Sequence, residues 1–398
     1  MDSKIQHQIS QVLNSLSRSG SLRTIPAIDH GSRLYLEYMG RKLLNLASNN
    51  YLGISGSDRV KKSAIRAISH NGASSSSSRL ISGNYKLHDQ LEKLLSEFKN
   101  QEKALVVGSG YTANLCILGA LAGRNTTIFS DRLNHASIID AAILSGAKNI
   151  RYRHNDTDHL SFILEKYRDR PSKILVTDTV FSMDGDTAPL VKMVDLCKKY
   201  NVLMVVDEAH ATGIFGRGRG LAHHLGLEKE IQVHMGTFSK ALGSYGGYIA
   251  SSKEIIDLII NRGRSFIYST ALPPAVVGAS LAALEIILEK PEQGGLLLTK
   301  SRQIRGFLQE LGFDTGQSST QIIPVILGKN SLTLKARQRL IDSGIFTGAI
   351  RPPTVPENTA RLRLSLRADM GEIEFESVRN AFAGLARELE LPGGTGTK

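Results

Sequence analysis

Between about residues 100 and 250, short apolar runs rich in β-branched residues alternate with segments of helical periodicity. Such alternation is typical of a mostly parallel sheet that is covered by helices on both faces. We expect seven strands, at 103–107, 126–130, 150–154, 173–177, 202–207, 233–237 and 247–250. The sequence therefore predicts an α/β protein whose large domain contains one seven-stranded, mostly parallel sheet flanked by helices.

The chain has 398 residues, a length that predicts two or three domains. A helix is expected over 274–290, and the Pro-Glu-Gln-Gly-Gly stretch at 291–295 is the best candidate for a domain boundary. We therefore expect an N-terminal segment at 1–48, a large domain at 49–290 and a small α/β domain at 291–398. The N-terminal segment, with an amphipathic helix around 5–16, is expected to pack on the small domain.

Composition narrows the function classes. Lysine and arginine total 49 against 37 acidic residues, which gives a net charge of +12, but the basic residues are scattered. This pattern favours an anionic small substrate over nucleic acid. Cys116 and Cys197 are expected to be buried, reduced thiols. Without a secretory leader or an apolar stretch of about 18 residues, a cytoplasmic protein with no membrane segment is expected. We expect no metal site.

Polar side chains follow several of the expected strands, where ligands of open parallel sheets bind. Asp207 ends one strand and Lys240 comes three residues after the end of another. A carboxylate that leaves an apolar strand needs a cation or a hydrogen-bond donor. The two residues could form a plain salt bridge, or Lys240 could act as a nucleophile or Schiff-base former.

Three further strand ends carry candidate residues. The Gly-Ser-Gly-Tyr turn at 108–111 opens a helix whose free N–H groups could bind a phosphate. His135 follows another strand, where a simple hydrogen-bonded turn histidine is the alternative, and Ser182 lies in a further polar turn. A lysine nucleophile, an aspartate for a pyridinium proton, a stacking ring and a phosphate cradle together match the requirements of pyridoxal 5′-phosphate.

Five motifs carry a resemblance to a known family. They are Ser-Asn-Asn-Tyr-Leu-Gly at 48–53, Asp-Arg-Leu-Asn-His-Ala-Ser at 131–137, Phe-Ser-Met-Asp-Gly-Asp at 181–186, Val-Asp-Glu-Ala-His at 206–210 and Thr-Phe-Ser-Lys at 237–240. With them the chain resembles the α-oxoamine synthases of the fold-type I pyridoxal-phosphate enzymes, from about Arg23 to about Leu389. The segments 350–356 and 359–363 resemble the branch that condenses L-alanine with a pimeloyl thioester in biotin biosynthesis.

The resemblance implies roles for individual residues. Lys240 would bind the cofactor covalently, Asp207 would bind its pyridine nitrogen, and His135 would stack on its ring, so these three would be catalytic. The other implied cofactor-binding residues are Gly110, Tyr111, Ser182, His210 and Thr237. The implied substrate-binding residues are Arg23, Asn49, His135, Thr354 and Arg363. Arg363 is expected to bind the carboxylate of the amino acid, and Arg23 the distal carboxylate of the acyl chain.

The resemblance also implies a homodimer with shared active sites, and an acyl group carried by coenzyme A or by an acyl carrier protein. The alternatives within the family are a glycine C-acetyltransferase (2-amino-3-ketobutyrate ligase) and a serine palmitoyltransferase. A catalytically silent homologue is a third alternative, although it would be expected to lack Lys240. In one departure from the family, Ser74, Ser76 and Ser77 stand where glycines are common.

Overall fold

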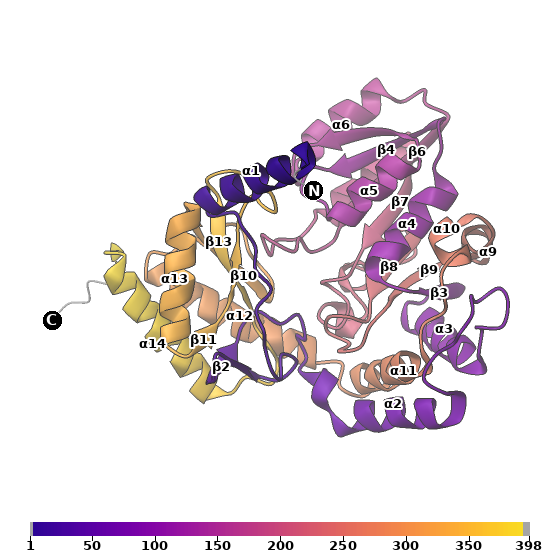
Figure 1. Ribbon diagram of the computed structural model, residues 1–398. Coiled ribbons are helices and arrows are strands. Elements are labelled where there is room, and N and C mark those ends of the chain that lie inside the picture. Colours follow the sequence, from indigo (N-terminus) through magenta and orange to yellow (C-terminus); the bar gives the residue numbers. More distant parts are fainter. Residues whose placement is uncertain (1–2, 393–398) are drawn as a thin grey trace. The chain divides into compact units, whose positions relative to one another are not determined.

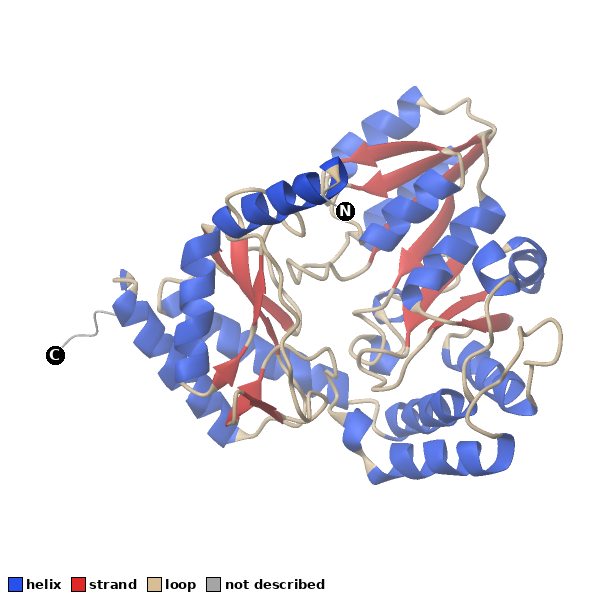
Figure 2. Cartoon of the chain, viewed as in Figure 1, coloured by secondary structure: helices blue, strands red, loops and turns tan. Residues whose placement is uncertain are grey.

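The computed structural model describes residues 3–392 and divides them into two compact units. Unit 1 consists of the described residues up to Ser48, the short stretch Met183–Gly185 and the described residues from Thr299 onward. Unit 2 consists of Asn49–Ser182 and Asp186–Leu298. Figure 1 labels many of the elements of both units, and Figure 2 colours helices and strands differently.

Unit 2 is built on a seven-stranded sheet, which confirms the predicted fold class. The strands are β3 (Lys103–Val107), β4 (Thr126–Asp131), β5 (Lys148–Tyr152), β6 (Ser172–Asp178), β7 (Leu203–Asp207), β8 (Val233–Thr237) and β9 (Gly247–Ser251), in the order β3-β9-β8-β7-β6-β4-β5. β9 is antiparallel to both of its neighbours, and the other pairs are parallel. β5 ends at Tyr152, so His154 lies beyond the strand in which it was predicted.

Helices flank this sheet. They are α2 (Asp58–Asn71), α3 (Lys86–Phe98), α4 (Gly110–Leu121), α5 (Ala136–Leu144), α6 (Thr157–Lys166), α7 (Leu190–Tyr200), α8 (Leu221–His224), α9 (Lys253–Arg262), α10 (Arg264–Ile267) and α11 (Pro274–Glu289), with short 3₁₀ turns at Ile54–Gly56 and Gly216–Gly218. α11 starts with a proline at its first position, where a missing N–H costs no hydrogen bond. α12 (Gln293–Glu310) follows and contains the boundary between the units after Leu298.

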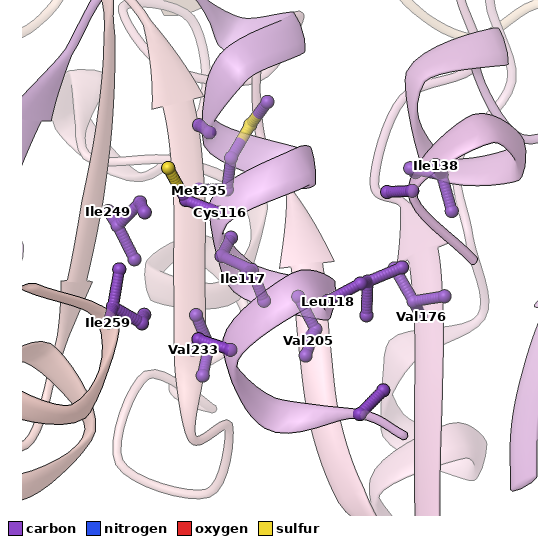
Figure 3. Close-up of a cluster of buried hydrophobic side chains, with 14 of the residues drawn as sticks. Cys116, Ile117, Leu118, Ile138, Val176, Val205, Val233, Met235, Ile249 and Ile259 are labelled. Atoms are coloured by element: carbon purple, nitrogen blue, oxygen red, sulfur yellow. The ribbon is translucent and has the colours of Figure 1, made fainter. Parts of the chain in front are cut away.

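The core of unit 2 lies between α4 and the central strands (Figure 3). Cys116, Ile117 and Leu118 of α4 are buried against apolar side chains of β6, β7, β8 and β9. Each such side chain contributes about 1.5–3 kcal/mol when it is fully buried. Cys116 and Cys197 are both buried and form no disulfide. α4 is therefore held rigidly, and its first turn lies at the carboxyl edge of the sheet.

Unit 1 contains two three-stranded sheets. β1 (Tyr35–Tyr38), β2 (Arg41–Asn45) and β11 (Ile345–Phe346) form one, and β10 (Ile322–Gly328), β13 (Ala360–Ser365) and β12 (Gly348–Ile350) form the other, with β13 in the centre. The helices are α1 (Lys4–Arg18), the later part of α12, α13 (Asn330–Asp342) and α14 (Glu372–Glu388). β2 pairs with β11, so the N-terminal segment shares a sheet with the C-terminal part of the chain. Among residues 3–392, no helix is both long enough and apolar enough to cross a membrane.

The serine tract at 74–78 includes one residue with a backbone conformation that is typical of glycine. Ser76 has a φ of 53°, in the left-handed region that glycine occupies most easily. The Ser74 hydroxyl accepts a hydrogen bond from the Ser76 backbone N–H at 3.0 Å. Such a local hydrogen bond helps a serine to hold this conformation.

Candidate active site

Asp207 is the most strongly fixed of the predicted site residues in unit 2. It ends β7 and is only 4% exposed. Its Oδ1 accepts a hydrogen bond from the Ala209 backbone N–H at 2.9 Å, and its Oδ2 accepts one from Asn114 Nδ2 at 2.9 Å. Two donors thus compensate for the burial of the carboxylate and fix its orientation.

Asp178 is the direct neighbour of Asp207 in the pairing of β6 with β7. Burial raises the pKa of Asp178 well above its usual range, and the negative charge of Asp207 raises it further. Two carboxyl groups this close cannot both ionise easily, so the raised pKa favours the protonated form of Asp178. Asp178 is therefore a buried neighbour of the carboxyl that the sequence assigned to the cofactor.

A hydrogen-bonded chain leads from Lys240 across the site. Lys240 Nζ lies 2.8 Å from His210 Nε2, and His210 Nδ1 lies 2.7 Å from the hydroxyl of Tyr51. That hydroxyl donates to Asn49 Oδ1 at 3.2 Å. Because the Tyr51 hydroxyl gives its proton to Asn49, the contact with His210 needs a proton on His210 Nδ1. In that tautomer, His210 Nε2 is the acceptor for Lys240. Three of the predicted residues, Lys240, His210 and Asn49, thus lie in one network.

His135 follows β4 and has an exposed ring. Its Nδ1 accepts from the Ser137 backbone N–H at 3.3 Å and lies 2.7 Å from the Ser137 hydroxyl, which leaves Nε2 as the protonated nitrogen. Desolvation by the surrounding protein lowers the pKa of His135, and the charge of Asp207 opposes this change. The ring is therefore a neutral flat surface with one N–H donor, which suits both stacking on a cofactor and proton donation.

Asn114 connects His135 to Asp207. Its Nδ2 donates to Ser137 Oγ at 2.8 Å and also to Asp207 Oδ2. Sequence reasoning missed Asn114 although it lies on α4, only four residues after Gly110. Asp178, Ser137 and Tyr51 were missed as individual positions too, although Ser137 and Tyr51 are parts of the motifs. Its position one helical turn after Gly110 is the sequence signal that could have identified Asn114.

The start of α4 is packed closely against β8 and β9. Ser109 caps the helix by accepting from the Thr112 N–H, and Gly110 is the first helical residue. A Cβ on Gly247 would collide with the Ser109 carbonyl oxygen, so only glycine allows β9 to approach this turn. Thr237 lies next to Gly110 and donates to the Gly246 carbonyl at 2.6 Å. Tyr111, the next residue, donates to Asp140 and lies edge-on to His135.

His154 supports the turn that carries Ser182. It bridges Asp131 at 3.0 Å and Asp186 at 2.8 Å, and it lies edge-on to Phe181 with the ring centroids 4.4 Å apart. Burial alone would lower the pKa of His154, but the two carboxylates outweigh burial and raise it to about 10. A charged His154 therefore ties the end of β4 to the turn at 181–186.

A buried ion pair fixes the residue after Asp207. Glu208 and Lys99 are both fully buried and form a direct ion pair, and Glu208 also accepts from the Ala222 N–H at 3.0 Å. Burial of Glu208 favours its neutral form, but Lys99 outweighs this effect and lowers the pKa of Glu208 below its usual range. The segment between Asp207 and His210 is thereby anchored at Glu208.

The remaining predicted residues belong to unit 1. Arg23 donates to the Thr354 hydroxyl at 3.0 Å. Arg363 is buried in β13 and donates to Ser365 Oγ at 2.7 Å, while its neighbour Arg361 pairs with Asp184 at 2.6 Å. Their substrate-binding roles stay predictions. Among residues 3–392, no group of three histidine, cysteine or acidic side chains is arranged to hold a metal ion.

Comparison with known proteins defines the class. The sequence model of the family "Aminotransferase class I and II" matches residues 41–382. The chain belongs to this family. Solved structures of serine palmitoyltransferases superpose closely: one that contains a PLP internal aldimine has a TM-score of 0.90 at 31% identity and covers 96% of this chain and 98% of its own. The protein from Sphingomonas wittichii has a TM-score of 0.91 at 30% identity, with 98% and 99% covered.

Curated relatives narrow the class to the α-oxoamine synthases. A protein of Bacillus cereus, named "Putative 8-amino-7-oxononanoate synthase", is 44% identical over 95% of this chain and 96% of its own length. A solved 8-amino-7-oxononanoate synthase from Francisella tularensis has a TM-score of 0.75 at 25% identity, with 87% and 98% covered. The predicted family and enzyme class are thereby confirmed.

Proposed function

We propose that this protein condenses L-alanine with a pimeloyl thioester to give 8-amino-7-oxononanoate, carbon dioxide and the free thiol, a cytoplasmic step of biotin biosynthesis. The hydrogen bond between Lys240 and His210, at the carboxyl edge that also presents Asp207, is the observation that carries the proposal. The names of the relatives at 43–46% identity supply the choice of substrates.

The residues of unit 2 fit pyridoxal 5′-phosphate, the cofactor of the family. When bound, this group supplies an aldehyde that reacts with amines and a ring that withdraws electrons from the α-carbon next to the amine. The turn at Gly110 and Tyr111, with Thr237 beside it, would offer backbone N–H groups to the phosphate. Asp207 offers an anion to the pyridine nitrogen, and His135 offers an exposed flat ring.

The same residues perform the proton transfers. The Lys240 amine would take the α-proton of alanine as a general base. Asp207 would hold a proton at the pyridine nitrogen, and the bound cofactor would supply an acceptor for negative charge on the substrate carbon. His135 donates its Nε2 proton to the developing carbonyl oxygen. Burial and the negative charge of Asp207 raise the pKa of Asp178 and so favour the neutral form of this neighbouring carboxyl.

Three of the residues proposed to recognise the substrates, Arg23, Thr354 and Arg363, belong to unit 1, and Asn49 belongs to unit 2. We propose that Arg363 binds the carboxylate of alanine, because a buried guanidinium offers a fixed pair of donors. Arg23, with Thr354, would bind the distal carboxylate of the acyl chain, since a buried unpaired charge at the end of that chain would cost several kcal/mol. Asn49 would contact the substrate from its position beside Tyr51. The acyl group would arrive on coenzyme A or on an acyl carrier protein.

A homodimer with shared active sites is also proposed. Tyr268 is 73% exposed, and the Arg264 guanidinium lies 5.1 Å from its ring centroid. Within residues 3–392, Arg262 and Arg264 form none of the observed ion pairs, so they are available to a second subunit. Sedimentation at micromolar concentration should give a dimer, and a fully active monomer would contradict this part of the proposal.

Serine palmitoyltransferase is the second candidate, because its solved structures superpose with TM-scores of 0.90–0.91 against 0.75 for the Francisella tularensis enzyme. The test supplies alanine, glycine or serine together with pimeloyl-CoA or palmitoyl-CoA and identifies products by mass. We expect product from alanine with pimeloyl-CoA, none with Lys240→Ala, and an unchanged yield with Lys253→Ala, a surface lysine paired with Asp257. Product chiefly from serine with palmitoyl-CoA would favour the second candidate.

A further inference from the structure

Unit 1 contains a cavity of about 420 Å³ that is lined by three arginines. Arg23 comes from the N-terminal segment, Arg337 from α13, and Arg351 from the segment that follows β12. Apolar side chains, among them Tyr38 and Phe346, line much of the rest, together with Thr24 and Thr347. No aspartate or glutamate is among the described residues that line the cavity. The volume is in the range of about 300–1,000 Å³ that is usual for ligand pockets.

The three guanidinium groups are held in different ways. Arg351 donates to the backbone carbonyls of Gly20 and Leu22, so it mainly fixes the N-terminal segment. Arg337 donates its Nε to the Thr347 carbonyl at 3.1 Å and stacks on the ring of Phe346 at 4.9 Å. This arrangement orients the Arg337 guanidinium and uses only one of its five N–H groups.

The other basic residues of α13 differ from Arg337. Lys335 and Arg339 share one face of the helix and both pair with Glu388, at 3.7 and 2.5 Å. Arg337 forms no ion pair with any described residue. An arginine stacked on an aromatic ring beside a cavity, with no acidic partner, is available to bind an anion.

The cavity is electrostatically suited to an anion. Burial lowers the pKa of Arg351, and the positive charges of Arg23 and Arg337 lower it further, which shows that the three groups repel one another. An oxyanion that enters the cavity would relieve this repulsion and accept hydrogen bonds from planar donors. The apolar walls would favour a hydrocarbon chain behind that oxyanion.

We propose that Arg337 is a specificity-determining residue, and that it forms with Arg23 a two-arginine clamp for the carboxylate at the end of an apolar acyl chain. Arg351 positions the clamp by holding the backbone next to Arg23. This inference rests on the proposed function for the identity of the chain, which is the seven-carbon pimeloyl group. It adds to that function a second cationic residue and a preformed pocket.

The test measures binding without turnover. Titration calorimetry with the full-length protein would use pimelate, its uncharged diamide and inorganic phosphate as probes. Arg337→Met keeps the apolar stem on Phe346 but removes the guanidinium, and Arg339→Met is the matched control on the same helix. We expect Arg337→Met to weaken pimelate binding about tenfold to a hundredfold, the usual loss for a charge-assisted hydrogen bond, and Arg339→Met to leave it unchanged.

Three other outcomes would overturn the inference. Equal losses in the two variants would show only general attraction by positive charge. Diamide binding as tight as pimelate binding would show that no carboxylate is recognised. Phosphate binding that depends on Arg337, without pimelate binding, would make a phosphate of the acyl carrier the occupant. The binding measurement contains no alanine, so it tests the pocket separately from the reaction. If pimelate binding is intact but the condensation reaction fails, the proposed function is contradicted and the pocket assignment still holds.

Discussion

Asn114 is the residue on which the geometry of Asp207 depends most directly. It is only 1% exposed, and its single amide nitrogen donates to both Asp207 Oδ2 and Ser137 Oγ. A hydrogen bond to a charged group contributes about 1.5–3 kcal/mol, and one between neutral groups about 0.5–1.5 kcal/mol. Asn114→Ala should therefore lower the free energy of unfolding by about 2–4.5 kcal/mol, with the larger share lost at Asp207.

Two double-mutant cycles separate these shares. Urea unfolding of the apoprotein gives the free energies for Asn114→Ala, Asp207→Ala, Ser137→Ala and the two double variants that contain Asn114→Ala. The coupling energy of Asn114 with Asp207 should be about 1.5–3 kcal/mol and should exceed its coupling energy with Ser137. A coupling energy with Asp207 below about 0.5 kcal/mol, or one smaller than that with Ser137, would refute the argument that Asn114 orients the carboxylate.

Three further predictions concern the cofactor, the pH dependence and the acyl chain. Borohydride reduction of the protein with pyridoxal 5′-phosphate, followed by peptide mapping, should place the label on Lys240, and a label on Lys253 would refute the site. The pKa of His154 is raised from 6.5 to about 10, so its contribution to stability should be complete below pH 6.5 and should disappear as the pH rises to about 10. His154→Gln should therefore flatten the fall in unfolding free energy over this range, and an unchanged pH profile would contradict the assignment. Arg23→Ala should raise KM for the pimeloyl thioester about tenfold to a hundredfold and leave KM for alanine unchanged, whereas an unchanged KM for the thioester would exclude Arg23 as its ligand.

The sequence predicted the central strands and the edge strand β3 better than the other edge strand, β5. The apolar runs at 173–177 and 233–237 match β6 and β8 closely, because central strands of a parallel sheet are buried on both faces. β5 is the last strand in the sheet order, and its first residues, Lys148 and Asn149, are polar. The apolar signal therefore starts late at an edge strand, and the predicted range of 150–154 ran two residues past Tyr152.

The site could be predicted where chemistry depends on residue type, and not where it depends on tertiary contact. Asp207 and Lys240 were found because each follows an apolar strand. Asp178 was missed because its influence on Asp207 arises from the pairing of β6 with β7, which no local pattern encodes. Arg337 was missed for a similar reason. Its partner ring, Phe346, lies nine positions along the chain, and the residues that line the cavity come from separate segments, including β11 and β12.

The fate of the alanine carboxylate tests the central claim most directly. The protein with pyridoxal 5′-phosphate would be given L-alanine labelled with carbon-13 at the carboxyl group, together with pimeloyl-CoA. We predict one labelled carbon dioxide for each thiol released, and an 8-amino-7-oxononanoate product that carries no label. Label retained in the product, or pyruvate formed without release of thiol, would contradict a decarboxylative condensation.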